Sequence, residues 1–415
     1  MKNQKHIWIL NYYSTPPELA SNERHLRLTH YLQEYGYKVT LFSSDFFIKN
    51  DDTFSTDGNY VQARYGEYNF NHIKVSKYKG NGLSRMFSLF QFSWRVYKYR
   101  NKFEKPDIIL HNFHAPFDFF ICCCAKKLKV RYIAEAWDLW PEDFVTFGLI
   151  SKRNPLLKLS YSIERMIYEK ADNIIYTFEG GLAYLREKRW TDKTGGKVKE
   201  NKVHYINNGI SLEDFNKNIE LFKFTDDDLM APNIYKIVYM GSINYVNDLK
   251  QLIDAVSLLK EYDNIRLLIF GDGDYRASLM EYCKSRNIYN VVFKEKWVPL
   301  KYVPFILSNA SLNILNYMKG FGNYGISSGK LFQYLAAGKP IICNIPIHYD
   351  DVITNNNLGI ADNLDTSEKY AKAILKISKM SNDDYISMSA RVLETAKQFD
   401  YKILTQKLIN IIENE

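Results

Sequence analysis

Residues 324–340, YGISSGKLFQYLAAGKP, lead from a loop of small residues into an apolar-faced helix that ends at a glycine. The segment SLNILNY just before them is typical of a buried strand, so the order is strand, loop, helix. Backbone N–H groups at a helix N-terminus lack partners and, together with the helix dipole, attract anions. The stretch predicts either an anion-binding loop or an ordinary capping loop in an α/β domain. The loop residues suited to anion contacts are Gly325, Ser327, Ser328, Gly329 and Lys330.

Short apolar segments alternate with helical ones along the whole chain. The expected strands include HIWIL, KVTLFSS, DIILHNF, VRYIAEAW and DNIIYTF in the first half, and KIVYMGS, IRLLIFGDG, VVFKEKW, SLNILNY and PIICN in the second. Apolar strands separated by helices indicate parallel sheets covered on both faces. We predict the α/β class, with two doubly wound Rossmann-like domains facing across a cleft. Ligands should lie at the carboxyl ends of the strands.

The length of 415 residues also favours two domains. Residues 212–233 are polar, charged and unpatterned, which predicts a linker between the domains. We therefore expect an N-terminal domain over 1–211 and a C-terminal domain over 234–395. The remaining residues, 396–415, carry an amphipathic helix that we expect to cross back to the first domain.

The composition is that of a globular protein, with 46% hydrophobic residues, 25% charged residues and a net charge of +8. The positive balance favours acidic partners such as nucleic acid, an anionic membrane surface or phosphate-bearing small molecules. The N-terminus is expected to form a first strand instead of a signal peptide. Three of the five cysteines are consecutive, which suits neither a zinc site nor a disulfide framework, so a reducing cytoplasm is expected.

Two further loops lead from a strand into a helix. NYYSTPPELASNERHLR follows the first strand, and GSINYVNDLK follows the strand KIVYM at the start of the second half. A diphosphate that bridges two domains would account for all three loops together.

These segments, in this order, resemble family 4 glycosyltransferases of the GT-B fold, in the branch that builds O-antigen and capsule polysaccharides. The most specific match is EAWDLWPEDFVTFGL, and the family pattern is also followed by ASNERHLRLTHYLQEYGYKV, IERMIYEKADNIIYTFEG, VHYINNGI and VYMGSINYVNDLKQLIDAV. The resemblance covers nearly the whole chain. It implies sugar transfer from a nucleotide diphosphate sugar, such as a UDP-sugar, with retention at the anomeric carbon. It also implies that the domain over 1–211 binds the acceptor and that the domain over 234–395 binds the nucleotide sugar.

The resemblance also assigns residues, with departures from the family pattern. The paired glycines of the first loop fall on Ala20 and Ser21, and the lysine that commonly grips the diphosphate falls on Asn247. Two family glutamates fall on Gly325 and Gln333; glutamine keeps the hydrogen bonds but loses their charge-assisted strength. The expected donor site comprises Gly241, Ser242, Asn247, Lys250, Gly325, Ser327, Ser328, Gly329, Lys330 and Gln333.

Charge that grows on the leaving diphosphate has to be neutralised, and backbone amides with lysines meet that need without a divalent metal. No cofactor is expected. The candidate catalytic residues are Asp138, His114 and Glu135, which lie at or after strand ends. A helix cap or a buried ion pair is the alternative role for Asp138, and a plain hydrogen bond is the alternative for His114.

The first helix carries Arg24 next to His25. Arg24, with Ala20 and Ser21, is expected to meet phosphate, whereas a solvated helix face is expected for His25. The acidic pair in DGD (272–274) is similar to a metal-binding motif, but we expect a turn after a buried strand, because the pair precedes a helix.

The segment 78–106, YKGNGLSRMFSLFQFSWRVYKYRNKFEKP, interleaves basic and aromatic residues. That mixture suits a helix lying on anionic lipid, and a plain surface helix is the alternative. Nucleic acid is not an expected partner, since no nucleic-acid fold signature accompanies the segment. We expect a lipid-linked saccharide acceptor, carried on polyprenyl diphosphate, and a cytoplasmic protein that is peripheral on the inner face of the cell membrane.

Two other functions remain open on the same fold. One is a sugar-nucleotide epimerase or hydrolase, and the other is a non-catalytic sugar-nucleotide-binding partner of a polysaccharide assembly. The substitutions at Gly325, Gln333 and Asn247 keep the second alternative open. A dehydrogenase is disfavoured, because no glycine-rich dinucleotide fingerprint follows the first strand.

Overall fold

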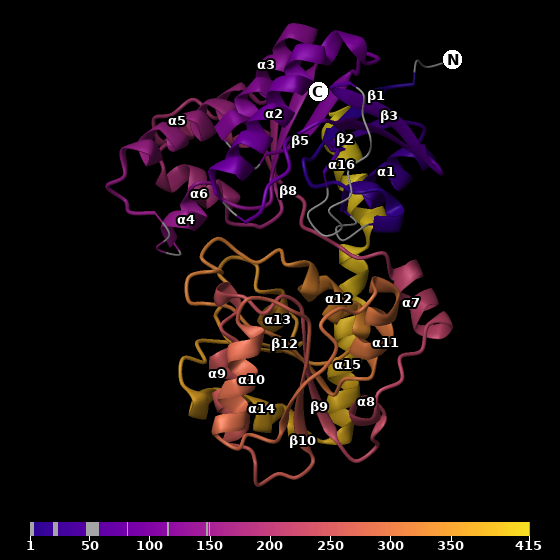
Figure 1. The fold of residues 1–415 in the computed structure, drawn as a ribbon, viewed down its shortest axis with the longest axis vertical. Helices are drawn as coiled ribbons and strands as arrows, with labels where there is room; N and C mark the ends of the chain where they lie inside the picture. The colour runs from indigo at the N-terminus through magenta and orange to yellow at the C-terminus, as the bar shows by residue number, and fades with distance from the viewer. Residues whose placement is uncertain are drawn as a thin grey trace. The chain divides into compact units, whose positions relative to one another are not determined.

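The computed structural model describes residues 4–19, 24–46, 58–80, 82–113, 116–146, 148 and 150–414. The chain divides into two compact units, one of residues 1–207 with 401–415 and the other of residues 208–400. Each unit is built on its own sheet with helices packed against it (Figure 1). The predicted α/β class with two parallel-sheet, Rossmann-like halves is confirmed.

The sheet of the first unit has eight strands in the order β3-β4-β2-β1-β5-β6-β7-β8. Neighbouring strands are parallel except for the antiparallel pair β3 and β4. The strands are β1 (His6–Leu10), β2 (Lys38–Ser44), β3 (Tyr60–Tyr65), β4 (Tyr68–Ile73), β5 (Ile108–Asn112), β6 (Arg131–Ala136), β7 (Asn173–Tyr176) and β8 (Val203–Tyr205).

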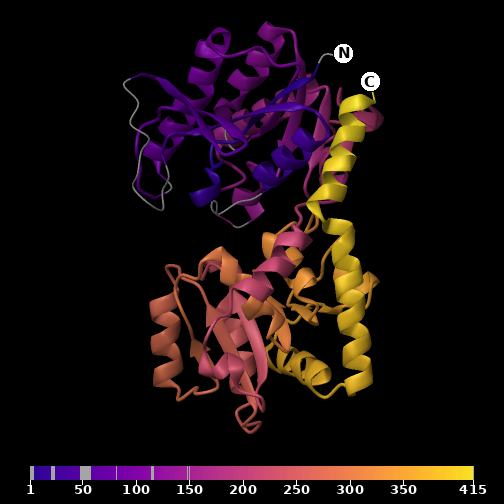
Figure 2. The same cartoon turned by 90° about the vertical axis from the view of Figure 1, so that its right-hand side faces the viewer.

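One face of this sheet is closed by helices from opposite ends of the chain. α1 (Arg24–Glu34) packs beside α16 (Tyr401–Glu413), and both contribute to one apolar cluster with Ile7 and Ile9 of β1 (Figures 1 and 2). On the other face Trp8 contacts Phe42, with ring centroids 4.6 Å apart. The remaining helices of this unit are α2 (Leu83–Tyr99), α3 (Phe119–Leu128), α4 (Glu142–Thr146), α5 (Pro155–Lys170) and α6 (Gly181–Glu187).

The sheet of the second unit has six parallel strands in the order β11-β10-β9-β12-β13-β14. Its strands are β9 (Tyr235–Met240), β10 (Ile265–Phe270), β11 (Val291–Phe293), β12 (Leu312–Leu315), β13 (Ile341–Cys343) and β14 (Gly359–Ala361). Apolar clusters lie on both faces. The helices are α7 (Leu212–Leu221), α8 (Asp227–Met230), α9 (Leu249–Ser257), α10 (Arg276–Ser285), α11 (Val303–Ser308), α12 (Gly329–Ala337), α13 (Val352–Asn355), α14 (Ser367–Ser378) and α15 (Asn382–Ala396).

The segment 212–233, which we expected to be a linker, instead forms α7 and α8 within the second unit. Leu212, Phe215 and Ile219 recur at helical spacing and pack against the core of that unit, so the charged residues between them occupy only the outer side of the helix. The chain passes from one unit to the other at residues 207–208 and again at 400–401.

The sequence analysis assigned no element to residues 60–73, which form the β3–β4 hairpin. Gly66 occupies the turn with φ +59°, a left-handed conformation that glycine adopts without strain.

All five cysteines are free, and four of them are buried. Among the helices in the described part of the chain, none has the length and apolar character that a membrane span requires.

Candidate functional site

The loop before α12 belongs to the unit of residues 208–400. Gly325 has φ +101°, a conformation that favours glycine. Ser328 precedes the helix with extended backbone, φ −69° and ψ 131°, and its side chain makes no capping hydrogen bond. The amide groups of Gly329 and Lys330 open the helix, so no carbonyl one turn earlier receives their protons. Among the described residues these two amide groups therefore have no backbone acceptor, which is the arrangement that suits an anion.

Lys330 turns back from α12 toward β9, the first strand of the same sheet. Its Nζ donates to Tyr239 Oη and to Asn247 Oδ1, both at 3.1 Å. The ammonium group also lies 4.8 Å and 5.3 Å from the ring centroids of Tyr239 and Tyr317. No carboxylate of the described residues pairs with it, and burial lowers the pKa of Lys330 to about 8. Within the described part of the chain, the positive charge of this lysine therefore has no counter-ion.

Gly241 gives the lysine its space. It has φ +147°, and a Cβ at this position would lie 3.1 Å from Lys330 Cδ. At Gly271 a Cβ would lie 1.9 Å from the carbonyl oxygen of Gly241, so these two backbones can approach only because residue 271 is glycine. The DGD segment forms the turn after β10 with both aspartates exposed, and the described residues hold no cluster of metal-ligating side chains.

Asn247 and Ser242 complete the support of the lysine. Asn247 is buried, and its Nδ2 donates to Ser242 Oγ at 3.2 Å while its Oδ1 accepts from Lys330. Lys250, in contrast, donates to Asp254 on its own helix at 2.7 Å and lies over the ring of Tyr282. The structure thus gathers Ser242, Asn247 and Lys330, whereas Lys250 is engaged away from the loop.

Ser327 is bound by the segment through which the chain enters this unit. Its Oγ accepts from the backbone N–H of Asn208 at 3.0 Å, and its carbonyl accepts from the Asn208 side-chain amide at 2.8 Å. These bonds fix the shape of the loop, so Ser327 has a positioning role. Gln333 lies one turn after Gly329 on the same side of α12, and its half-buried amide has no partner among the described residues.

In the other unit, the carboxyl end of β6 holds a buried charge cluster. Glu135 Oε1 accepts from Arg24 Nε and Nη2 at 3.0 and 2.7 Å. Its Oε2 bonds His25 Nε2 at 2.8 Å and accepts from Trp137 Nε1 at 2.7 Å. Burial alone would raise the pKa of Glu135, but the adjacent Arg24 and His25 hold it below its usual range.

This cluster corrects three expectations. Arg24 also donates to the carbonyls of Asn207 and Ile206, at 2.6 and 3.0 Å, so it ties α1 to neighbouring strand ends and does not present its donors to phosphate. Glu135 is saturated by donors, and a positioning role replaces the expected catalytic one. His25 is 1% exposed and lies inside the cluster, not on a solvated face, because Glu135 draws it inward.

Asp138 follows this strand end and is exposed, with no partner among the described residues. Of the expected catalytic residues it is the one whose carboxylate is available to a ligand. His114, Ala20 and Ser21 lie outside the described residues, so their expected roles remain predictions.

Sequence reasoning missed Tyr239, Tyr317, Asn208 and Trp137 as parts of these sites. Tyr239 lies in a correctly located strand and Trp137 directly follows another. An aromatic side chain with a polar group at or near a strand end could have indicated a role in these sites. Asn208 lies in the Asn-Asn-Gly turn, where turn chemistry alone accounts for asparagine, so no signal marked its contact with Ser327.

Two family models match the chain. "Glycosyltransferase Family 4" matches residues 23–214, and "Glycosyl transferases group 1" matches residues 226–399. Among curated proteins, the "Putative teichuronic acid biosynthesis glycosyltransferase TuaH" of Bacillus subtilis (strain 168) is 29% identical over 227 residues. That alignment covers 52% of this chain and 51% of the relative. The chain therefore spans about half the length of the curated relative that it matches.

Solved structures share the whole fold. A glycosyltransferase from Rickettsia africae has a TM-score of 0.64 at 15% identity, with 100% of both chains covered. Anabaena Alr3699/HepE, solved in complex with UDP, has a TM-score of 0.66 at 12% identity, with 99% of this chain and 100% of that chain covered. At these identities the likeness shows the fold alone.

Replacing Glu135 with glutamine tests the positioning role. Because Arg24 would lose its charged partner inside the protein, we expect the free energy of unfolding to fall by ~3 kcal/mol in urea denaturation. The depressed pKa means that the carboxylate contributes at neutral pH, so the deficit should shrink only as the pH falls into the acidic range. The control is Glu34→Gln, an exposed ion pair with His30 on the same helix as Arg24. Equal stability of the two variants would contradict the role.

Proposed function

We propose that this chain, whose first half matches a glycosyltransferase family 4 model and whose second half matches a glycosyl transferases group 1 model, transfers a sugar from a nucleotide diphosphate sugar to a saccharide acceptor. The observation that carries this proposal is the uncompensated ammonium group of Lys330 beside the unpaired amides that open α12. A diphosphate supplies the negative charge that both features lack.

The donor we propose is a UDP-sugar. Anabaena HepE, which shares the fold, was solved with UDP. The lysine that the family resemblance places at Asn247 is absent here, but Lys330 brings its ammonium group to that asparagine, at 3.1 Å from Oδ1. The proposed donor site therefore keeps its positive charge by supplying it from α12. It comprises the loop 325–330 with Gly241, Ser242, Asn247 and Gln333.

We propose that transfer proceeds with retention and without a metal. Negative charge on the departing diphosphate would be stabilised by the amides of Gly329 and Lys330, the hydroxyl of Ser328 and the lysine ammonium group. These groups are held in place by Ser242, Asn247 and the contact of Ser327 with Asn208, so little reorganisation is needed when the charge develops. In the other unit, Asp138 is proposed to orient the acceptor.

The acceptor we propose is a saccharide linked to polyprenyl diphosphate in surface polysaccharide synthesis, with the protein bound to the cytoplasmic face of the membrane. The support is an aromatic surface on α2 and α3. Phe90 stacks against Trp94 and contacts Phe120, Phe87 is 52% exposed, and Lys98 lies over Trp94. Half-exposed aromatics beside cations suit the lipid interface. Phe92, from the same segment, is buried and packs inward.

UDP affinity tests the role of Lys330. Lys330→Met keeps the length of the side chain and removes its charge, so we expect UDP to bind about ten- to a hundredfold more weakly in isothermal titration. Lys250→Met is the matched control, since Lys250 pairs with Asp254, and its affinity should stay close to that of the parent protein. A greater loss in the control than in Lys330→Met would overturn the site assignment.

The pH dependence of the same titration is a separate readout. With a pKa of about 8, Lys330 is charged at pH 7 and mostly neutral at pH 9. If a bound diphosphate keeps the lysine charged, the affinity for UDP should fall about tenfold between these two pH values. The Lys330→Met protein should not show this fall, and an equal slope in both proteins would assign the effect to another group.

Transfer itself is tested by incubating the protein with radiolabelled UDP-sugars and bacterial lipid extract. We expect label in the lipid fraction with the donor's anomeric configuration, as determined by NMR of the product, and a large loss of this label with Lys330→Met. Sugar nucleotide consumed equally fast without lipid would favour an epimerase or a hydrolase instead. Binding of UDP-sugars without consumption would favour a non-catalytic partner.

Membrane docking is tested by sedimentation with anionic liposomes. Replacing Phe87 and Trp94 with serine should reduce binding several-fold, because each half-exposed ring contributes apolar area to the interface. Trp297→Ser, which removes a 66% exposed tryptophan from the other unit, is the control and should bind like the parent protein. Unchanged sedimentation of the double variant would refute the docking surface.

A further inference from the structure

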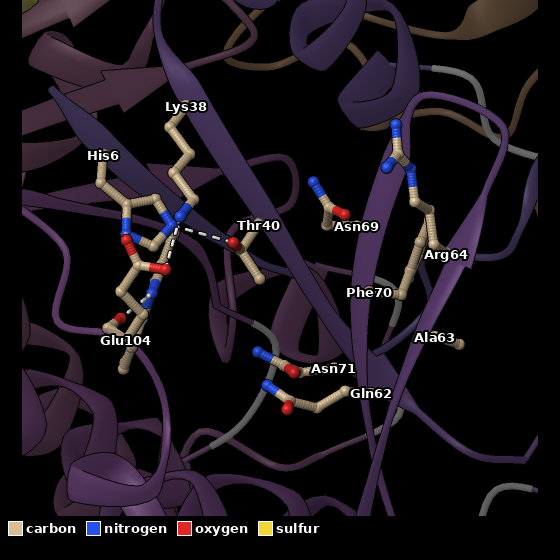
Figure 3. A pocket seen from close by; sticks show the side chains of 11 residues that line it. His6, Lys38, Thr40, Gln62, Ala63, Arg64, Asn69, Phe70, Asn71 and Glu104 are labelled. Atoms are coloured by element: carbon tan, nitrogen blue, oxygen red, sulfur yellow. Dashed lines mark hydrogen bonds and ion pairs between the residues drawn. The ribbon is translucent and has the colours of Figure 1, made fainter. Parts of the chain in front are cut away.

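A polar pocket of about 370 Å³ lies on the sheet of the first unit, at the amino ends of β1 and β2 (Figure 3). Register places His6 opposite Lys38 and Trp8 opposite Thr40 across these strands. The pocket continues over β4 and β3, where Asn71 pairs with Gln62. Glu135 and Asp138 lie at or after the carboxyl end of β6, so this pocket is at the opposite end of the sheet from the proposed acceptor site.

The charged side chains of the pocket are occupied by one another. Lys38 forms an ion pair with Glu104, and His6 Nε2 bonds Thr40 Oγ1 at 2.8 Å. Arg64, at the rim, donates from Nε to the carbonyl of Gly66 at 2.9 Å. Figure 3 shows Lys38 and Glu104 pointing toward each other at one side of the pocket.

The three carboxamide side chains of the pocket, in contrast to its charged side chains, are not occupied by partners in the part of the chain that the structure describes. Asn71 is 2% exposed, lines the pocket, and makes no side-chain hydrogen bond within the described residues. Gln62 lies beside it in Figure 3, and Asn69 also lines the pocket; neither side chain has a partner among the described residues. Because the side chain of Asn71 is 2% exposed and lines the pocket, its amide is open to a polar group, water or ligand, that enters there.

The chemistry of the amides selects the occupant. Each carboxamide presents both a donor and an acceptor, and a sugar hydroxyl also both donates and accepts. The ionised oxygens of a phosphate only accept, so they would leave the amide oxygens of Asn71, Asn69 and Gln62 facing negative charge. The volume lies at the lower end of the range for small-molecule sites.

We propose that this pocket is a second saccharide-binding site, separate from the site of transfer. It would bind a neutral sugar unit through Asn71, Asn69 and Gln62. The inference does not require the proposed donor or acceptor, since it rests on a different end of the sheet and on unpaired amides in one unit.

Saturation-transfer NMR tests the proposal, with glucose, N-acetylglucosamine and glucuronic acid as millimolar probes and the full chain as receptor. We expect at least one neutral probe to bind, and Asn71→Leu, which is close in size and lacks the amide, to weaken it about tenfold. The same variant should bind UDP normally, whereas Lys330→Met should lose UDP and keep the sugar. Because each variant should lose one ligand and keep the other, the two results distinguish failure of this site from failure of the proposed function.

Thermal melting accompanies the test, and Asn71→Leu should not be less stable than the parent protein, because it removes an unpaired buried amide. If it does unfold, Gln62→Ala with Asn69→Ala, both nearer the surface, replaces it with the same expected loss of sugar binding. Unchanged sugar binding in the folded variant, or binding of inorganic phosphate alone by ³¹P NMR, overturns the proposal.

Discussion

The proposed donor site depends on one charge, the ammonium group of Lys330, which neutral groups hold and which no described carboxylate neutralises. Two oxygens and two aromatic rings position it, and the space that it fills exists because residue 241 has no side chain. Loss of hydration lowers the pKa of Lys330 to about 8. The size of this shift reflects the free-energy cost of burying a cation without a counter-ion. A diphosphate bound at the proposed donor site would recover that cost.

Arg24 in the other unit shows the contrasting arrangement. Its guanidinium is 1% exposed, and its donors are taken by Glu135 and two backbone carbonyls. A cation so fully paired stabilises the ends of the strands but has little left to offer a ligand. Position near the carboxyl edge of a sheet is therefore insufficient to identify a phosphate contact; the balance of donors and acceptors around each cation decides between the two roles.

The sequence predicted most strands because buried parallel strands are short apolar runs between polar loops, and it located the loop 325–330 by its small residues. It could not show that Arg24 meets Glu135, 111 positions away, or that Lys330 meets Asn247, 83 positions away, since side-chain pairing is set by the packed fold. The helix at 212–221 was missed because its apolar residues, at helical spacing, are outnumbered by charged and polar residues together. The β3–β4 hairpin was missed because its strands are partly polar.

The segment that enters the second unit connects the anion loop to the place where the chain leaves it. Asn208 holds Ser327 with two hydrogen bonds, Ile210 donates to the carbonyl of Phe399 at 3.0 Å, and Leu212 donates to Asp400 Oδ2 at 3.0 Å. The segment that follows the first crossing is therefore hydrogen-bonded both to the segment that precedes the second crossing and to the loop. Asn208 thus connects the loop to the first crossing, because its backbone N–H and its side-chain amide both donate to Ser327.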